Sequence, residues 1–269
     1  MIYKIQKASF TKRISAMLFD FMMIVVVFLA CAFPMSALVG YDGYLDQKEA
    51  IQGSILEKHK IEEIEEKYVE NENVNFIKYD QTLTDEEKAA LPEEVQIAFK
   101  ACQDEINSNE DIARLTGTIF ILFITIFSTS LLMAFIILEF IVPLLFKNGQ
   151  TLGKKIFSLG VVRIDSVKVS PFILFVRTIL GKYTICTMVP LITFPIISSM
   201  PLVPLFFALL ILLLHIVFYI TSGTGALIHD KMASTAVVDM HTQMVFDSVE
   251  AREEYQLRIH REEASKADY

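Results

Sequence analysis

The sequence has no tryptophan, only three cysteines in 269 residues, and three long stretches that are almost free of charge. Two cysteines, Cys31 and Cys186, lie in apolar stretches and one, Cys102, in an acidic segment, so a disulfide scaffold is excluded. A hydrophobic content of 53% excludes a disordered chain, and the net charge of −8 excludes a generally basic, nucleic-acid-binding surface. Neither Gly-x-Ser-x-Gly nor His-Glu-x-x-His occurs, so no hydrolase is indicated.

The stretches without charge are long enough to cross a membrane. Residues 14–39 contain Asp20 as their one charge, and residues 115–146 contain Glu139. Residues 183–228 contain one histidine, His215, and suit a hairpin of two helices at about 183–199 and 202–222. Since a bilayer core needs about 20 apolar helical residues, four transmembrane helices are predicted. The alternative for residues 14–39 is a cleaved signal peptide. The apolar region of a signal peptide spans only roughly 7–15 residues, however, and is shorter than this stretch.

Basic residues flank these stretches on one side. The N-terminal tail carries four of them and no acid, and residues 147–182 carry seven against Asp165 alone. The positive-inside rule places both segments, and with four spans the C-terminus, in the cytoplasm. We expect five of these side chains to contact anionic lipid headgroups, namely Lys147, Lys154, Lys155, Arg177 and Lys182.

Acidic residues are concentrated between the first two spans. Residues 40–113 hold 20 acidic and 7 basic residues, and Val95, Phe99 and Cys102 recur there at helical spacing. Two β-branched runs at 160–164 and 235–238 are predicted to pair as strands. The predicted fold is an all-α polytopic membrane protein with four transmembrane helices, an extracytoplasmic helical insertion and a small cytoplasmic β pairing. Its segments are 1–39, 40–113, 114–240 and a charged helical tail at 241–269.

Three segments at the membrane boundaries form a specific combination. They are FTKRISAMLFD at 10–20, GQTLGKK at 149–155 and HDKMASTAVV at 229–238. With these segments in this order the chain resembles the RDD family of bacterial membrane proteins, over about 195 residues that leave out 40–113. The arginine and two aspartates that name the family map to Arg13, Asp20 and Asp230. The resemblance implies a multi-pass protein of the bacterial inner membrane, with cation/proton antiport proposed for some members.

Depth within the spans places three titratable residues in one layer. Asp20, Glu139 and His215 each lie six or seven residues from the cytoplasmic end of a span, which is about 9–11 Å at 1.5 Å per residue. Charges in hydrocarbon cost several kcal/mol unless they are paired, so we expect these residues to converge. With a hydroxyl from Thr187 they form the predicted cation or proton site. The alternative is a polar cluster that only holds the helices together.

Arg13 and Asp230 both lie at the predicted cytoplasmic interface. We expect them to form a structural clamp that joins the first span to the last.

The sequence is compatible with two functions. One is a transporter of monovalent cations or protons, and the other is a non-catalytic membrane scaffold or assembly factor whose acidic segment at 40–113 docks a protein partner. The five histidines are scattered along the chain. We therefore expect no enzymatic activity, no catalytic residue, no cofactor, no metal site and no nucleic-acid partner, and we expect the lipid bilayer as the surroundings of the protein.

Overall fold

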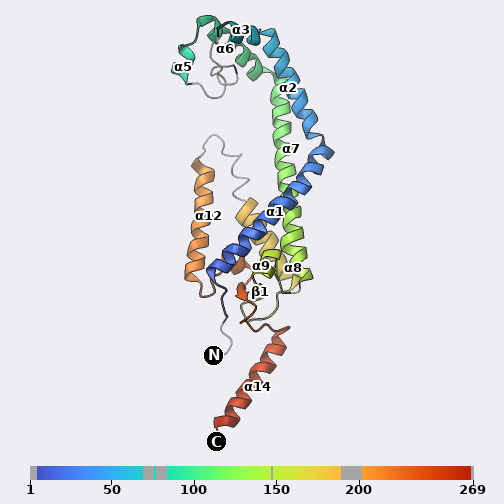
Figure 1. Cartoon of the computed structure of the whole chain (residues 1–269), viewed down its shortest axis with the longest axis vertical. Coiled ribbons are helices and arrows are strands. Elements are labelled where there is room, and N and C mark those ends of the chain that lie inside the picture. Colours follow the sequence, from blue (N-terminus) through green and yellow to red (C-terminus); the bar gives the residue numbers. More distant parts are fainter. Residues whose placement is uncertain (1–4, 69–75, 77–83, 147, 189–201, 268–269) are drawn as a thin grey trace. The chain divides into compact units, whose positions relative to one another are not determined.

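The computed structural model describes residues 5–68, 76, 84–146, 148–188 and 202–267 (Figure 1). The described chain is mostly helical and contains one two-stranded sheet. It divides into two compact units, which we call the discontinuous unit, Met1–Cys31 with Ser128–Tyr269, and the inserted unit, Ala32–Phe127. The inserted unit covers more of the sequence than the acidic segment 40–113, because it includes the adjoining ends of two long helices.

Two helices in the described part of the chain are long and apolar enough to cross a membrane. They are α1 (Phe10–Val39) and the continuous helix Glu110–Leu145. The second comprises α7 (Glu110–Phe135), the π-helix η1 (Ile136–Ile141) and α8 (Val142–Leu145). The predicted fourth span coincides with α12 (Leu202–Thr221), and the predicted third begins in the π-helix η2 (Val176–Met188). The rest of that third span and the turn after it lie outside the described residues, so the count of four stays a prediction.

A proline explains why the helix changes its register around Glu139. Pro143 has no amide hydrogen and cannot donate to the Glu139 carbonyl four residues before it. The amide of Val142 bonds to the carbonyl of Ile137, five residues back, and the Glu139 carbonyl accepts the hydroxyl of Thr178 at 3.1 Å. Short π-helical turns of this kind are frequent at functional sites. The local distortion therefore joins Glu139 to η2.

The predicted strand pairing is confirmed. β1 (Leu159–Arg163) and β2 (Thr235–Asp239) run antiparallel, with Val161 opposite Val237. Their β-branched side chains are buried, which is why the runs adopt the extended conformation here. The short helix α9 (Leu152–Ile156) precedes β1, α10 (Pro171–Phe175) leads into η2, and α13 (Ile228–Met232) precedes β2. The charged tail forms α14 (Val249–Ala267), as expected.

The described residues of the inserted unit are mostly helical, as predicted for the segment 40–113. After α1, Gly40 adopts a positive φ of 66° that ends the helix, a conformation that glycine adopts without strain. The helices that follow are α2 (Tyr41–Lys58), α3 (Ile61–Tyr68), α5 (Asp85–Ala89) and α6 (Glu93–Ser108). Helices α2, α3 and α6 pack against one another around an apolar core. Its buried members are Ile55, Ile61, Phe76, Val95, Phe99, Cys102 and Ile112.

Candidate functional site: a buried network of charges

Asp20 of α1 binds the beginning of α9. Its Oδ2 accepts a hydrogen bond from the Thr151 hydroxyl at 2.5 Å, and its Oδ1 accepts one from the Gly153 amide at 2.7 Å. A Cβ atom at Gly153 would lie 2.3 Å from the carbonyl oxygen of Ala16, so only glycine allows this close approach. The GQTLGKK segment therefore docks on the first helix through a glycine and a hydroxyl.

Lys154 follows in the same segment and carries a buried ammonium group. Its Nζ lies 3.2 Å from Thr151 Oγ1 and 4.0 Å from Asp20 Oδ2, and the residue is only 7% exposed. Burial lowers the pKa of Lys154 to about 8, although the charges of Glu139 and Asp20 act in the opposite direction. The expectation of headgroup contact is wrong for Lys154, because the side chain points into the protein.

Glu139 of η1 is buried and has one bonded and one unbonded oxygen. Oε1 accepts a hydrogen bond from Lys182 Nζ of η2 at 2.6 Å. Oε2 is buried and has no hydrogen-bond partner within the described part of the chain. An ionised carboxylate accepts several hydrogen bonds, so Oε2 can bind a further cation or proton. Lys182 was predicted at a headgroup and instead forms an ion pair with a buried acid.

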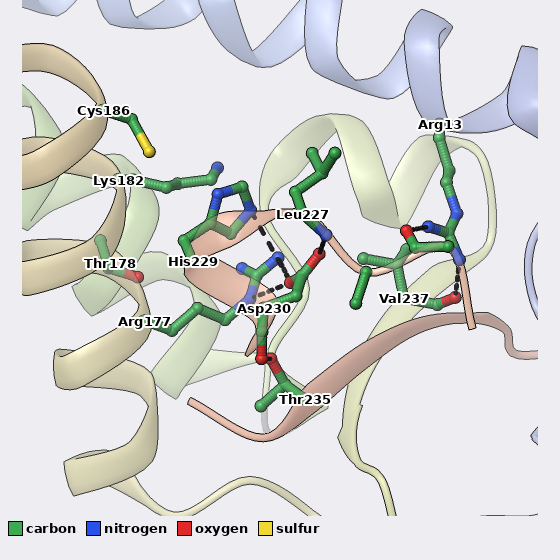
Figure 2. A network of polar contacts seen from close by, with 12 residues as sticks. Arg13, Arg177, Thr178, Lys182, Cys186, Leu227, His229, Asp230, Thr235 and Val237 are labelled. Carbon is green, nitrogen blue, oxygen red and sulfur yellow. Dashed lines mark hydrogen bonds and ion pairs between the residues drawn. The ribbon is translucent and has the colours of Figure 1, made fainter. Parts of the chain in front are cut away.

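Asp230 of α13 forms the most deeply buried ion pair described here (Figure 2). Arg177 of η2 donates a hydrogen bond from Nε to Asp230 Oδ1 at 2.8 Å, and its Nη2 lies 2.7 Å from the same oxygen. The amide of Leu227 donates to Oδ2 at 3.2 Å. Burial alone would raise the pKa of Asp230, but the charge and hydrogen bond of Arg177, together with His229 and the Leu227 amide, hold that pKa below its usual range. Arg177 is 2% exposed, so its predicted role at a lipid headgroup is also wrong.

Arg13 does not pair with Asp230 as the predicted clamp required. Its guanidinium donates to three backbone carbonyls, those of Thr224 at 3.0 Å, Gly225 at 2.6 Å and Val237 at 2.6 Å. Figure 2 shows Arg13 bonded to Val237 while Asp230 faces Arg177. Arg13 thus ties α1 to the loop between α12 and α13 and to β2. Arg13 therefore joins the first helix to the segment that follows α12, but it does so through backbone carbonyl groups. The carboxylate of Asp230 pairs with Arg177 instead.

The hydrogen bonds of His215 and Thr187 go to groups other than the carboxylates of Asp20 and Glu139. The Nδ1 of His215 lies 2.8 Å from the Ile211 carbonyl, and its Nε2 lies 3.6 Å from Cys186 Sγ. The Thr187 hydroxyl donates to the Lys182 carbonyl on its own helix. The prediction that Asp20, Glu139, His215 and Thr187 form one site is therefore wrong. Asp20 and Glu139 share Lys154 as a neighbour, whereas His215 belongs to a second group of side chains.

Lys155 and Lys147 are the two remaining residues that were predicted to contact lipid headgroups. Lys155 is exposed, and its Nζ lies 3.7 Å from the ring centroid of Phe146. Its contact with lipid stays a prediction. Lys147 lies outside the described residues.

Taken together, the buried charges form a network that is balanced in sign. Three carboxylates face three cations drawn from the segment that the sequence assigned to headgroups. Unpaired charges in a protein interior cost several kcal/mol each, so this matching explains how the carboxylates remain buried. Its members are the buried residues Asp20, Glu139, Asp230, Lys154 and Arg177 and the half-buried Lys182.

The comparison with protein families identifies the chain. The sequence model of the RDD family matches residues 98–234, about half of the chain. The chain belongs to the RDD family. RDD proteins are membrane proteins, which agrees with the two long apolar helices. No curated protein and no solved structure gives a significant match.

The family match covers only part of the network. It includes Glu139, Lys154, Arg177, Lys182 and Asp230, and it begins after Arg13 and Asp20. The assignment of these two to the family's arginine and first aspartate therefore rests on their position in the FTKRISAMLFD segment. The contacts of Asp20 with Thr151 and Gly153 tie that segment to the matched region of this RDD protein.

Proposed function

We propose that this RDD protein is a multi-pass protein of the bacterial cytoplasmic membrane that exchanges a monovalent cation for a proton. One observation carries the proposal: Lys154 is a buried cation next to two buried carboxylates, Asp20 and Glu139. A lysine whose pKa is lowered to about 8 can gain and lose a proton near neutral pH. Coupled exchange requires a group that binds a proton when the cation leaves and releases it when the cation binds.

The exchange step follows from charge balance. With Lys154 protonated, its ammonium serves as counter-ion to Asp20 and Glu139. A monovalent cation that binds the free Oε2 of Glu139 and a lone pair of Asp20 adds positive charge beside the ammonium. Lys154 then releases one proton, so one cation enters the site for each proton that leaves. Release of the cation allows Lys154 to bind a proton again.

The proposed topology follows the basic segments. We place the N-terminus, residues 147–182 and the C-terminal tail in the cytoplasm, and residues 40–113 on the other side. Four spans satisfy this arrangement, namely α1, the helix Glu110–Leu145, the third span that the sequence predicts at about 183–199, and α12. The site would then lie near the cytoplasmic surface, because Lys154 belongs to a cytoplasmic segment.

Everted membrane vesicles provide the test. A pH-sensitive dye should report proton movement when Na⁺, K⁺ or Li⁺ is added to vesicles that contain the wild-type protein. Asp20→Asn and Glu139→Gln should each abolish the signal, since each removes a carboxylate of the site. Glu253→Gln on the exposed face of α14 is the matched control and should keep it. Retained exchange in both site variants, at equal protein levels, would overturn the proposal.

A scaffold or assembly factor is the second candidate, and the inserted unit favours it. This unit has its own apolar core and carries exposed acidic side chains such as Glu62, Glu63 and Glu94. A folded acidic surface of this kind suits a basic protein partner. Wild-type vesicles that show no exchange with any of the three cations would make the scaffold the leading candidate.

A further inference from the structure

A second group of side chains lies beside the charge network and takes no part in the proposed exchange. Cys186 of η2, His215 of α12 and His229 of α13 each offer one ligand atom, and these atoms all lie within 4.8 Å of one another. The three elements come from separate parts of the sequence. We propose that Cys186, His215 and His229 form a binding site for a Zn²⁺ ion.

The distance between Cys186 Sγ and His215 Nε2 fits the coordination of zinc. In tetrahedral geometry a Zn–S bond of about 2.3 Å and a Zn–N bond of about 2.0 Å place the two ligand atoms about 3.5 Å apart. Cys186 Sγ lies 3.6 Å from His215 Nε2. The pair therefore needs little movement to hold the ion.

The tautomer of His215 is set for coordination. Its Nδ1 lies 2.8 Å from the carbonyl oxygen of Ile211, and this contact is a hydrogen bond only if Nδ1 carries the proton. Nε2 then has a free lone pair directed at Cys186. A backbone carbonyl that fixes the second nitrogen in this way is usual for metal-binding histidines.

His229 supplies an independent sign of a ligand. It is 6% exposed, and its Nδ1 is buried without a hydrogen-bond partner within the described part of the chain. A buried polar atom without a partner costs free energy unless something binds it. The other nitrogen, Nε2, lies 3.7 Å from Asp230 Oδ1, which is longer than a hydrogen bond but places a negative charge beside the ring of a metal-bound His229.

Close packing holds the third ligand in place. A Cβ atom at Gly181 would lie 2.7 Å from the Cβ of His229, so glycine allows α13 to pack directly on η2. Figure 2 shows Cys186 and Lys182 on the η2 side of the His229 ring and Asp230 on the other. The imidazole is thus fixed between the thiol side and the carboxylate.

The donor set selects the class of metal. One thiolate and two imidazoles suit Zn²⁺, whereas Mg²⁺ and Ca²⁺ require oxygen ligands. Binding replaces the thiol proton of Cys186, which leaves to solvent, and three protein ligands leave one coordination position for water or a further ligand. The site does not depend on the proposed cation exchange, because its ligands do not include Asp20, Glu139 or Lys154.

Cobalt substitution tests the proposal. The purified full-length protein in detergent, freed of metal, is titrated with Co²⁺ and then with Zn²⁺. We expect one Co²⁺ per chain, visible d–d bands of tetrahedral intensity, a near-ultraviolet thiolate-to-cobalt band, and displacement of Co²⁺ by Zn²⁺. A folded wild-type protein without the thiolate band, or one that binds only Cu⁺, overturns the assignment.

Variants locate the site. Cys186→Ser should remove the thiolate band, and His215→Gln and His229→Gln should each weaken Co²⁺ binding by at least about tenfold. Cys31→Ser and His241→Gln are matched controls outside the group and should bind as the wild type does. Circular dichroism and gel filtration verify the fold of each variant. A thiolate band that persists in Cys186→Ser, or disappears in Cys31→Ser, contradicts the proposal.

Discussion

The two units of this protein use the same residue types in opposite ways. In the inserted unit, Glu105 lies at the surface and accepts hydrogen bonds from Lys58 and His59, which lower its pKa. In the discontinuous unit, Glu139 is 2% exposed and pairs with Lys182. The inserted unit buries apolar side chains and leaves its charges in water, whereas the discontinuous unit buries matched charges. We therefore expect the loss of an ion pair to cost little stability in the first unit and much more in the second.

The largest effect is expected from the Arg177–Asp230 pair. Asp230→Ala leaves the guanidinium of Arg177 buried without its carboxylate, and such a change costs about 3–5 kcal/mol. The measurement is the free energy of unfolding in detergent, or the protein level in membranes if unfolding is irreversible. The double variant Arg177→Met/Asp230→Leu removes both charges and should recover most of the loss. A single variant as stable as the wild type would contradict the importance of matched charges.

A smaller loss is expected from Gly153→Ala. The added methyl group would meet the Ala16 carbonyl at 2.3 Å and the Asp20 carboxylate at 2.9 Å, and overpacking of this kind costs about 1–3 kcal/mol. Gly117→Ala is the control, because a Cβ atom there has nothing within 4 Å. Thermal unfolding of both variants gives the comparison. Equal melting temperatures would show that α9 does not dock on α1 through Gly153.

The pH dependence of stability should reveal Lys154. Its pKa is about 8 in the folded protein and near 10.5 in the unfolded chain, so between these values the unfolded chain binds more protons. The free energy of unfolding should therefore rise with pH in this window, by at most about 1.4 kcal/mol per pH unit. Asp20, Glu139, Arg177 and Lys182 are the charged groups around it. Lys154→Met should flatten the rise, and an unchanged slope would contradict burial of the charge.

The smallest effect is expected from Glu105→Gln. Its partners, Lys58 and His59, are close enough to solvent for water to replace the lost interaction. We expect no measurable change in the unfolding midpoint of the inserted unit. A loss as large as that of Asp230→Ala would remove the contrast between the two units.

The local spacing of residue types was enough to predict the two strands and the buried face of α6. The β-branched runs around Val161 and Val237 pair as strands, and the helical spacing of Val95, Phe99 and Cys102 identifies the buried face of α6. The cost of burying a charge also identified Asp20 and Glu139 as residues that must be paired. These inferences need only periodicity and transfer free energies.

The partners of these charges could not be read from the sequence, because tertiary packing chooses them. Thr151 lies 131 residues from Asp20, and Lys182 lies 43 residues from Glu139. The positive-inside rule counts basic residues without regard to their direction, so it assigned Lys154 and Arg177 to headgroups although both point inward.

Proton release on cation binding tests the central claim that Lys154 is the proton carrier. The purified protein, weakly buffered in detergent at about pH 7.5 with an indicator dye, receives Na⁺, K⁺ or Li⁺. We predict release of up to one proton per chain with the transported cation, no release from Lys154→Gln, and normal release from Lys155→Gln, whose lysine is the exposed neighbour. Equal proton release from Lys154→Gln and the wild type would contradict the claim.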